Sequence, residues 1–150
     1  MFSKLIVPVD GSEPSNAAVR LAIGFASQIR ASLIFCDVVD VTSLIALSGA
    51  TMDPGIVIES ERELAREVVA KAVEDARRAG VPARGEVPEG EVVETVLSLV
   101  KQEGAGAVVM GSHGRGGLAR AVLGSKAEGV LRRSPVPVLI APPRAAVQRE

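Results

Sequence analysis

Short apolar segments alternate with longer segments of helical periodicity along nearly the whole chain. This alternation constrains the fold more than any other feature. The apolar runs predict buried strands at 5–9, 33–39, 107–110 and 136–140, with a weaker edge strand at 81–87. The helical patterns lie between them, at about 13–29, 59–79, 91–103 and 125–133. Parallel strands joined by helices need right-handed crossovers, so we expect an α/β fold: a single-domain, open, parallel five-stranded sheet with helices on both faces.

The boundaries of this domain follow from where the alternation stops. We expect one folded domain over 1–141 and a loose C-terminal tail over 142–150. Within the domain, the pattern dissolves between Asp40 and about Ile56 into Ser, Thr, Gly, Asp and Pro. The 40–58 connection is therefore predicted to be a long loop, and loops of that length often act as lids.

Composition narrows the function classes. The chain has 17 basic and 18 acidic residues, and its aromatic residues are three Phe with no Tyr or Trp. No nucleic-acid partner is expected, because the chain has no basic run and so few aromatic rings leave little for stacking on bases. No membrane partner is expected, because no apolar run approaches a membrane span. The single cysteine, Cys36, favours a reducing, cytoplasmic location and an inert core thiol.

The residues with chemical potential gather at the predicted carboxyl ends of strands. Asp10 follows the first strand, Asp37 and Val38 end the second, and a glycine-rich segment at 111–117 follows the fourth. Open parallel sheets bind ligands outside the carboxyl ends of their strands, where the direction of the connections switches. The sequence therefore predicts a ligand site at that edge.

Two familiar phosphate motifs fit the glycine-rich segment poorly. Gly111 and Gly116 have the separation of a Walker loop, but Gly117 and Leu118 stand where that loop needs Lys and Ser or Thr. A dinucleotide fingerprint, Gly-x-Gly-x-x-Ala, ends at Ala119. It follows the fourth strand rather than the first, and no acidic residue ends the next strand to hold a ribose.

A third spacing fits completely: Gly111, two residues, Gly114, nine residues, then Gly124-Ser125. With the opening Ile6-Val7-Pro8-Val9-Asp10-Gly11-Ser12 and the closing Ser134-Pro135-Val136-Pro137-Val138-Leu139, it resembles the ATP-binding type of the universal stress protein family. The resemblance covers essentially the whole chain and implies that the domain over 1–141 is a universal stress protein-like nucleotide-binding domain. It implies a Rossmann-like fold of the adenine nucleotide alpha hydrolase-like kind.

The physical chemistry of this segment supports anion binding independently of the family. Closely spaced glycines let backbone N–H groups converge on phosphate oxygens, and Gly124-Ser125 opens a helix whose N-terminus favours negative charge. The resemblance further implies ATP, ADP or AMP, with adenine against the main chain near Val38. It also implies Asp10 beside the ribose or beside a phosphate-bound Mg²⁺ or Mn²⁺. The residues expected to bind the nucleotide are Pro8, Val9, Asp10, Val38, Met110, Gly111, Ser112, His113, Gly114, Arg115, Gly116, Gly124, Ser125 and Lys126.

Structural roles compete with binding roles at three of these positions. Ser125 and Glu128 have the spacing of a capping box, which would make Ser125 a helix cap. Asp10 is a candidate turn residue. His113 is the lone histidine, without a neighbour for a metal site, so packing or lining the phosphates is expected of it rather than catalysis.

Three functions remain open at the level of sequence. The first, which the resemblance implies, is a nucleotide-responsive regulatory or protective module in stress response, without dedicated catalytic activity. The second is a slow ATPase using the same site, and the third is an interaction module that holds no nucleotide. The apolar last strand, interrupted by Pro137, also predicts a homodimer built on that edge, while the protein partner is unknown.

Overall fold

The computed structural model describes residues 1–113 and 123–142 and confirms the predicted α/β architecture. The described strands are β1 (Lys4–Pro8), β2 (Ser32–Cys36), β3 (Ala83–Glu86), β4 (Ala107–Gly111) and β5 (Val138–Ala141). Within the described residues they form one five-stranded parallel sheet in the order β3-β2-β1-β4-β5. The chain runs outward from β1 to β3, then returns to β4 on the other side of β1. The switch point predicted for a ligand therefore lies between β1 and β4.

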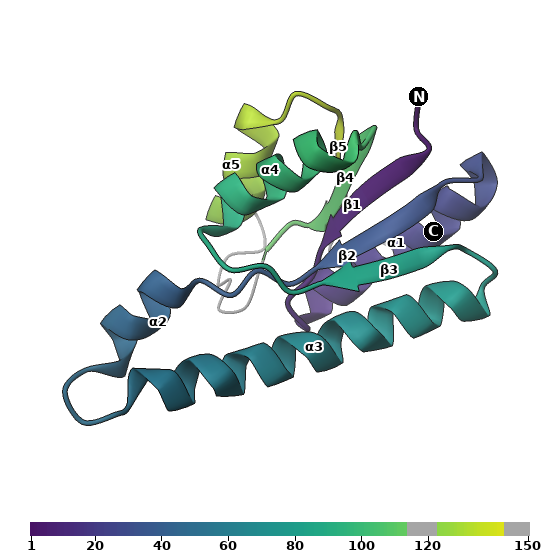
Figure 1. Cartoon of the computed structure of the whole chain (residues 1–150). Coiled ribbons are helices and arrows are strands. Elements are labelled where there is room, and N and C mark those ends of the chain that lie inside the picture. Colours follow the sequence, from purple (N-terminus) through teal and green to yellow (C-terminus); the bar gives the residue numbers. More distant parts are fainter. Residues whose placement is uncertain (114–122, 143–150) are drawn as a thin grey trace.

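Helices cover both faces of the sheet (Figure 1). They are α1 (Glu13–Ile29), α2 (Val41–Ser48), α3 (Pro54–Arg78), α4 (Val92–Glu103) and α5 (Ser125–Arg133). The α1 and α3 helices pack on one face, and α4 and α5 pack on the other. This division is what right-handed crossovers require, because the connections on the two sides of β1 advance in opposite directions.

Side-chain alternation along each strand supplies the two apolar cores. Leu5 and Val7 of β1 face α1 and α3, whereas Ile6 faces α4 and α5. The central strands are buried on both sides, which explains why they read as continuous apolar runs. Short residues on the helices, such as Ala22 and Ala72, let the helix backbones approach the sheet closely.

The 40–58 connection is not the predicted loop. Its first part forms α2, and α3 begins at Pro54, five residues before the predicted start. Asp40 caps α2 by accepting a hydrogen bond from the N–H of Ser43 at 3.0 Å, and Asp53 caps α3 through the N–H of Gly55 at 2.8 Å. The apolar, uncharged sequence of α2 lacks the amphipathic pattern that identified the other helices. Figure 1 shows α2 and the first turns of α3 extending beyond the sheet.

Candidate nucleotide site

A cavity of about 260 Å³ lies at the carboxyl ends of β1, β2 and β4, at the switch point of the sheet. In Figure 1 these strand ends point toward the side of the molecule from which α2 projects. The residues that line it are Pro8, Val9, Asp10, Ser15, Cys36, Asp37, Val38, Val92, Met110, Gly111, His113, Lys126 and Ala127. Its position is the one expected for a ligand of an open parallel sheet.

The turn from β1 into α1 holds Asp10 at the cavity. One carboxylate oxygen of Asp10, Oδ1, accepts the N–H of Ser12 at 2.9 Å, and the N–H of Asp10 donates to Ser15 Oγ at 3.0 Å. Ser12 in turn caps α1 by accepting the N–H of Ser15 at 3.3 Å. Gly11 completes the turn with a φ of +81°, in the left-handed region that favours glycine. Asp10 is thus a turn residue and a cavity residue at once.

The end of β4 packs directly against the start of α1. A Cβ at Gly111 would lie 2.6 Å from the carbonyl oxygen of Pro14, so only glycine fits at this approach. Beyond it, Ser112 Oγ and His113 Nδ1 are 3.0 Å apart. When Ser112 donates that bond, His113 Nε2 carries the proton. Within the described residues this buried nitrogen has no hydrogen-bond partner, which fits a donor that awaits an acceptor from a ligand.

The α5 helix differs from the other described helices at its N-terminus. Its N-cap is Gly124, which offers no side chain, whereas the N-cap side chains of the others, Ser12, Asp40, Asp53 and Glu91, accept backbone N–H groups. The capping-box alternative for Ser125 is therefore wrong, because Ser125 is already the first helical residue. The first turn of α5 meets the cavity through Lys126 and Ala127. Its N–H groups and dipole favour an anion there.

Charge is divided across the cavity. Lys126 stands on the α5 side, 3.7 Å from Glu91. Hydrogen bonds from the backbone N–H groups of Glu94 and Val93 lower the pKa of Glu91, and the charge of Lys126 lowers it further. On the β2 side lies the buried carboxyl group of Asp37.

Cys36 lies beside that buried carboxyl group. Burial, together with the charges of Asp37 and Glu86, raises the pKa of the Cys36 thiol far above its usual range, so this thiol stays protonated. The prediction of an inert thiol is consistent with this environment, although Cys36 also touches the cavity.

The structure brings together most of the residues that the sequence singled out. Eight line the cavity: Pro8, Val9, Asp10, Val38, Met110, Gly111, His113 and Lys126. Three lie next to it without lining it: Ser112, Gly124 and Ser125. Gly114, Arg115 and Gly116 lie outside the described residues.

Sequence reasoning missed four lining residues, Ser15, Cys36, Val92 and Ala127, and it placed Asp37 at the ligand-binding edge without including it among the binding residues. Asp37 carried a signal, since a carboxylate at the end of an apolar strand is unusual. Ser15 carried no signal of a binding role, because serine is common at the start of a helix, where it serves as a cap.

The lining contains no phenylalanine, and its walls away from the charged groups are aliphatic. No group of three or more His, Cys, Asp or Glu residues suited to a metal ion occurs among the residues that the structure describes. A cation at this cavity would therefore depend on oxygens supplied by a ligand, together with a carboxylate such as that of Asp10.

Comparison with known proteins decides the family. The Universal stress protein family model matches residues 1–142. The chain belongs to the universal stress protein family. Universal stress protein YxiE of Bacillus subtilis is 33% identical to it over 146 residues, which cover 93% of this chain and 99% of YxiE. The described part of the chain contains no helix with the length and apolar run needed to span a membrane.

Solved structures of the family share the fold. A universal stress family protein from Burkholderia pseudomallei superposes with a TM-score of 0.77 and 28% identity, over 95% of this chain and 97% of that one. A universal stress protein in complex with cAMP has a TM-score of 0.65 and 24% identity, over 94% and 97%. The Archaeoglobus fulgidus protein in complex with dAMP has a TM-score of 0.64 and 19% identity, over 93% and 97%.

Proposed function

We propose that this universal stress protein binds ATP and serves as a nucleotide-responsive regulatory module rather than a dedicated enzyme. One observation carries the proposal: three features that favour an anion face the same cavity. They are the N-terminus of α5 without a side-chain cap, the ammonium group of Lys126 and the ring of the lining residue His113, whose buried Nε2 has no hydrogen-bond partner among the described residues. A phosphate group satisfies all three together.

The proposed orientation of the nucleotide follows from the different chemistry at the two ends of the cavity. The phosphates lie toward α5, and adenine lies toward the end of β2, where its edge can bond to the main chain at Val38. The base packs against aliphatic side chains such as Val92 and Met110, because no phenylalanine lines the cavity. The relatives solved with cAMP and dAMP support an adenine nucleotide as the ligand class.

A divalent cation, Mg²⁺ or Mn²⁺, fits this arrangement as a companion of the phosphates. Mg²⁺ is usually held by one or two carboxylates and by phosphate oxygens, with water completing its shell. Asp10 is held at the cavity by the N–H of Ser12, which donates to its Oδ1 at 2.9 Å. The cation would neutralise phosphate charge, while Asp10 positions it.

Nucleotide binding is tested by thermal unfolding and by absorbance. ATP at about 100 times its Kd should stabilise the native state by about 2.7 kcal/mol. Because the chain has no Trp or Tyr, a 260 nm band in purified protein free of nucleic acid would reveal bound nucleotide directly. A Gly114→Val variant should lose both signals. No rise in melting temperature with millimolar ATP, ADP or AMP would favour the interaction module instead.

The same variant separates the regulatory module from a slow ATPase. Under single-turnover conditions we expect no ATP cleavage above that of the Gly114→Val variant. Cleavage that disappears in the variant would contradict the proposal and assign hydrolysis to the cavity.

We also propose that the domain over 1–141 forms a cytoplasmic homodimer through β5. This strand is an edge of the sheet, and its Val138, Leu139 and Ile140 are only partly buried. An apolar edge of this kind favours pairing with a second chain. Sedimentation at micromolar concentration should give twice the chain mass, and Leu139→Lys should halve it.

A further inference from the structure

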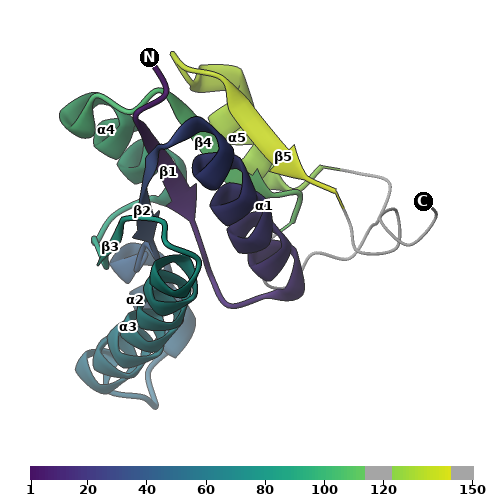
Figure 2. The same cartoon turned by 90° about the vertical axis from the view of Figure 1, so that its right-hand side faces the viewer.

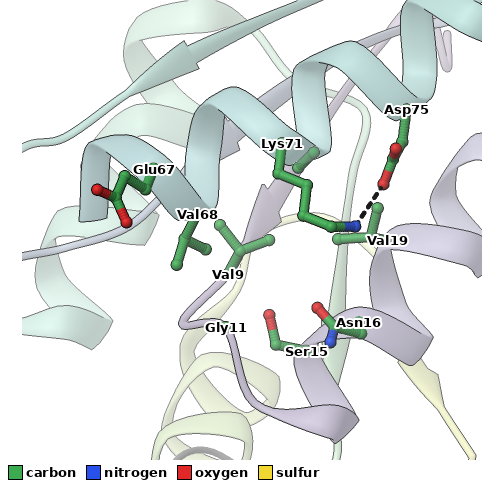
Figure 3. A pocket seen from close by; sticks show the side chains of 10 residues that line it. Val9, Gly11, Ser15, Asn16, Val19, Glu67, Val68, Lys71 and Asp75 are labelled. Carbon is green, nitrogen blue, oxygen red and sulfur yellow. Dashed lines mark hydrogen bonds and ion pairs between the residues drawn. The ribbon is translucent and has the colours of Figure 1, made fainter. Parts of the chain in front are cut away.

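A second cavity, of about 230 Å³, lies on the other side of the β1–α1 turn, between α1 and α3 (Figure 3). Its residues come from three segments: the end of β1, the first turns of α1 and the middle of α3. They are Val9, Gly11, Ser15, Asn16, Val19, Glu67, Val68, Lys71, Ala72 and Asp75. No described residue of the glycine-rich segment or of α5 lines it, so the proposed nucleotide does not account for it.

The floor of this cavity is apolar. Val9, Val19 and Ala72 are buried, and Val68 is half-buried against Gly11. A dry cavity of about 150 Å³ lined by aliphatic and aromatic side chains accommodates benzene. A cavity of about 230 Å³ with a valine floor therefore has room for one ring and a small substituent.

The mouth of this cavity carries both hydrogen-bond donors and hydrogen-bond acceptors. Lys71 Nζ lies 3.2 Å from Asp75 Oδ2, and this ion pair runs along α3 on one side of the mouth (Figure 3). Both side chains are substantially exposed, so the ion pair is weak and either group can bond to a ligand instead. The Asn16 amide makes no hydrogen bond to any described residue, and it offers a donor and an acceptor side by side. The carboxylate of Glu67 points away from these three groups.

This arrangement selects the charge of the ligand. An anion would be attracted by Lys71 and repelled by Asp75, and a cation would meet the opposite pair of forces. A neutral group with an adjacent donor and acceptor, such as a carboxamide or the amide edge of a heterocycle, complements Lys71, Asp75 and Asn16 together.

We propose that this second cavity is a binding site for a small neutral ring compound with an amide-type edge. The ring packs on the valine floor, and the amide edge meets the polar groups at the mouth. The site adjoins the nucleotide cavity, because Val9 and Ser15 line both, and Ser15 Oγ accepts the N–H of Asp10. A ligand in the second cavity therefore contacts the residues that position Asp10.

The test uses benzamide as the probe, with benzoate and benzylamine as charged counterparts of the same size. In a methyl NMR titration of the full chain without nucleotide, benzamide should shift Val9, Val19 and Val68 with a Kd of about 1 mM, the range expected for nine heavy atoms. The two charged probes should bind at least about fivefold more weakly. Shifts confined to Val38, Val92 and Met110 would place the probe in the nucleotide cavity and overturn the proposal, as would no shift at all.

Two pairs of variants locate the probe. Asn16→Ala should weaken benzamide about tenfold without changing the fold, whereas Gln28→Ala, which removes an exposed amide elsewhere on α1, should have no effect. Ala72→Leu, which fills the floor, should abolish binding, and Ala70→Leu on the exposed side of α3 should not. Unchanged affinity in both Asn16→Ala and Ala72→Leu would overturn the proposal. Because no nucleotide is present, these results are independent of whether ATP binds.

Discussion

The two cavities share the turn between β1 and α1, yet they differ in chemistry. The nucleotide cavity faces the N-terminus of α5, where backbone N–H groups lack partners within the helix. The second cavity faces the flanks of α1 and α3, where the backbone is already paired and valine side chains form the surface. In this fold, therefore, the polarity of a cavity depends on whether it meets the end of a helix or its side. Figure 2 shows the two helices, α1 and α3, whose residues line the second cavity.

Of the variants that compare the two cavities, Gly111→Ala should have the largest effect, and it should disturb both of them. Its Cβ would meet the backbone of Pro14 at 2.6 Å, so β4 and the start of α1 would have to separate. Because α1 lines both cavities, both should be disturbed. We expect a loss of about 3 kcal/mol in the free energy of unfolding, measured with urea. Gly24→Ala, where nothing lies within 4 Å, should instead stabilise α1 by about 0.5–1 kcal/mol. Similar values for the two variants would contradict this account of Gly111.

Lys126→Gln should distinguish the cavities by ligand. Loss of a charge-assisted contact to phosphate should weaken ATP by about 10- to 100-fold, measured by calorimetry. The Lys71→Gln variant serves as the matched control, because Lys71 lines only the second cavity. We expect little change in ATP affinity from it. An equal loss of ATP affinity in the two variants would mean that ATP does not bind specifically in the nucleotide cavity.

Ser15→Ala should affect the two cavities together. Ser15 is buried, and its hydroxyl accepts the N–H of Asp10, so the variant leaves that N–H without its partner. The expected cost is about 1–2 kcal/mol in the free energy of unfolding, with weaker binding of both ATP and benzamide. Ser27→Ala, at an exposed position of α1, is the control. A change in only one ligand's affinity would show that the turn does not link the cavities.

The smallest effect should be on the pH dependence of the free energy of unfolding at acidic pH, and it should come from Glu91 beside the nucleotide cavity. The pKa of Glu91 is lowered in the folded protein from its ordinary value of 4.5. The ionised form is therefore favoured by folding, and its contribution is present above pH 4.5 and is lost as the pH falls through the folded pKa. Glu91→Gln should flatten the stability curve below about pH 4.5, by a few tenths of a kcal/mol at this exposed site.

Much of the fold was predictable because its signals are local. Strands β1, β2 and β4 are apolar runs, and α5 begins at the predicted residue, Ser125. The α2 helix was not predictable in the same way. Its residues carry no charge and follow no amphipathic period, and its start depends on a hydrogen bond to Asp40.

The nucleotide cavity was partly predictable, since strand ends and glycine spacing mark it. The second cavity was not, because Asn16 and Lys71 are more than 50 positions apart and meet only when α1 and α3 pack side by side. Neither residue is unusual on a helix surface. Their proximity is a property of tertiary packing, which no local pattern records.

The hydrogen bond from the N–H of Gly124 to the carbonyl oxygen of Ser112, at 2.7 Å, has a consequence for engineering. It joins the residue that follows β4 to the N-cap of α5, so the start of α5 is tied directly to the end of β4. Each doubling of the segment between these two residues adds only about 0.6 kcal/mol of closure entropy. Foreign sequences exchanged between His113 and Leu123 should thus leave the anion-binding end of α5 in place. The protein would become a scaffold on which ligand preference is altered by replacing one stretch of chain.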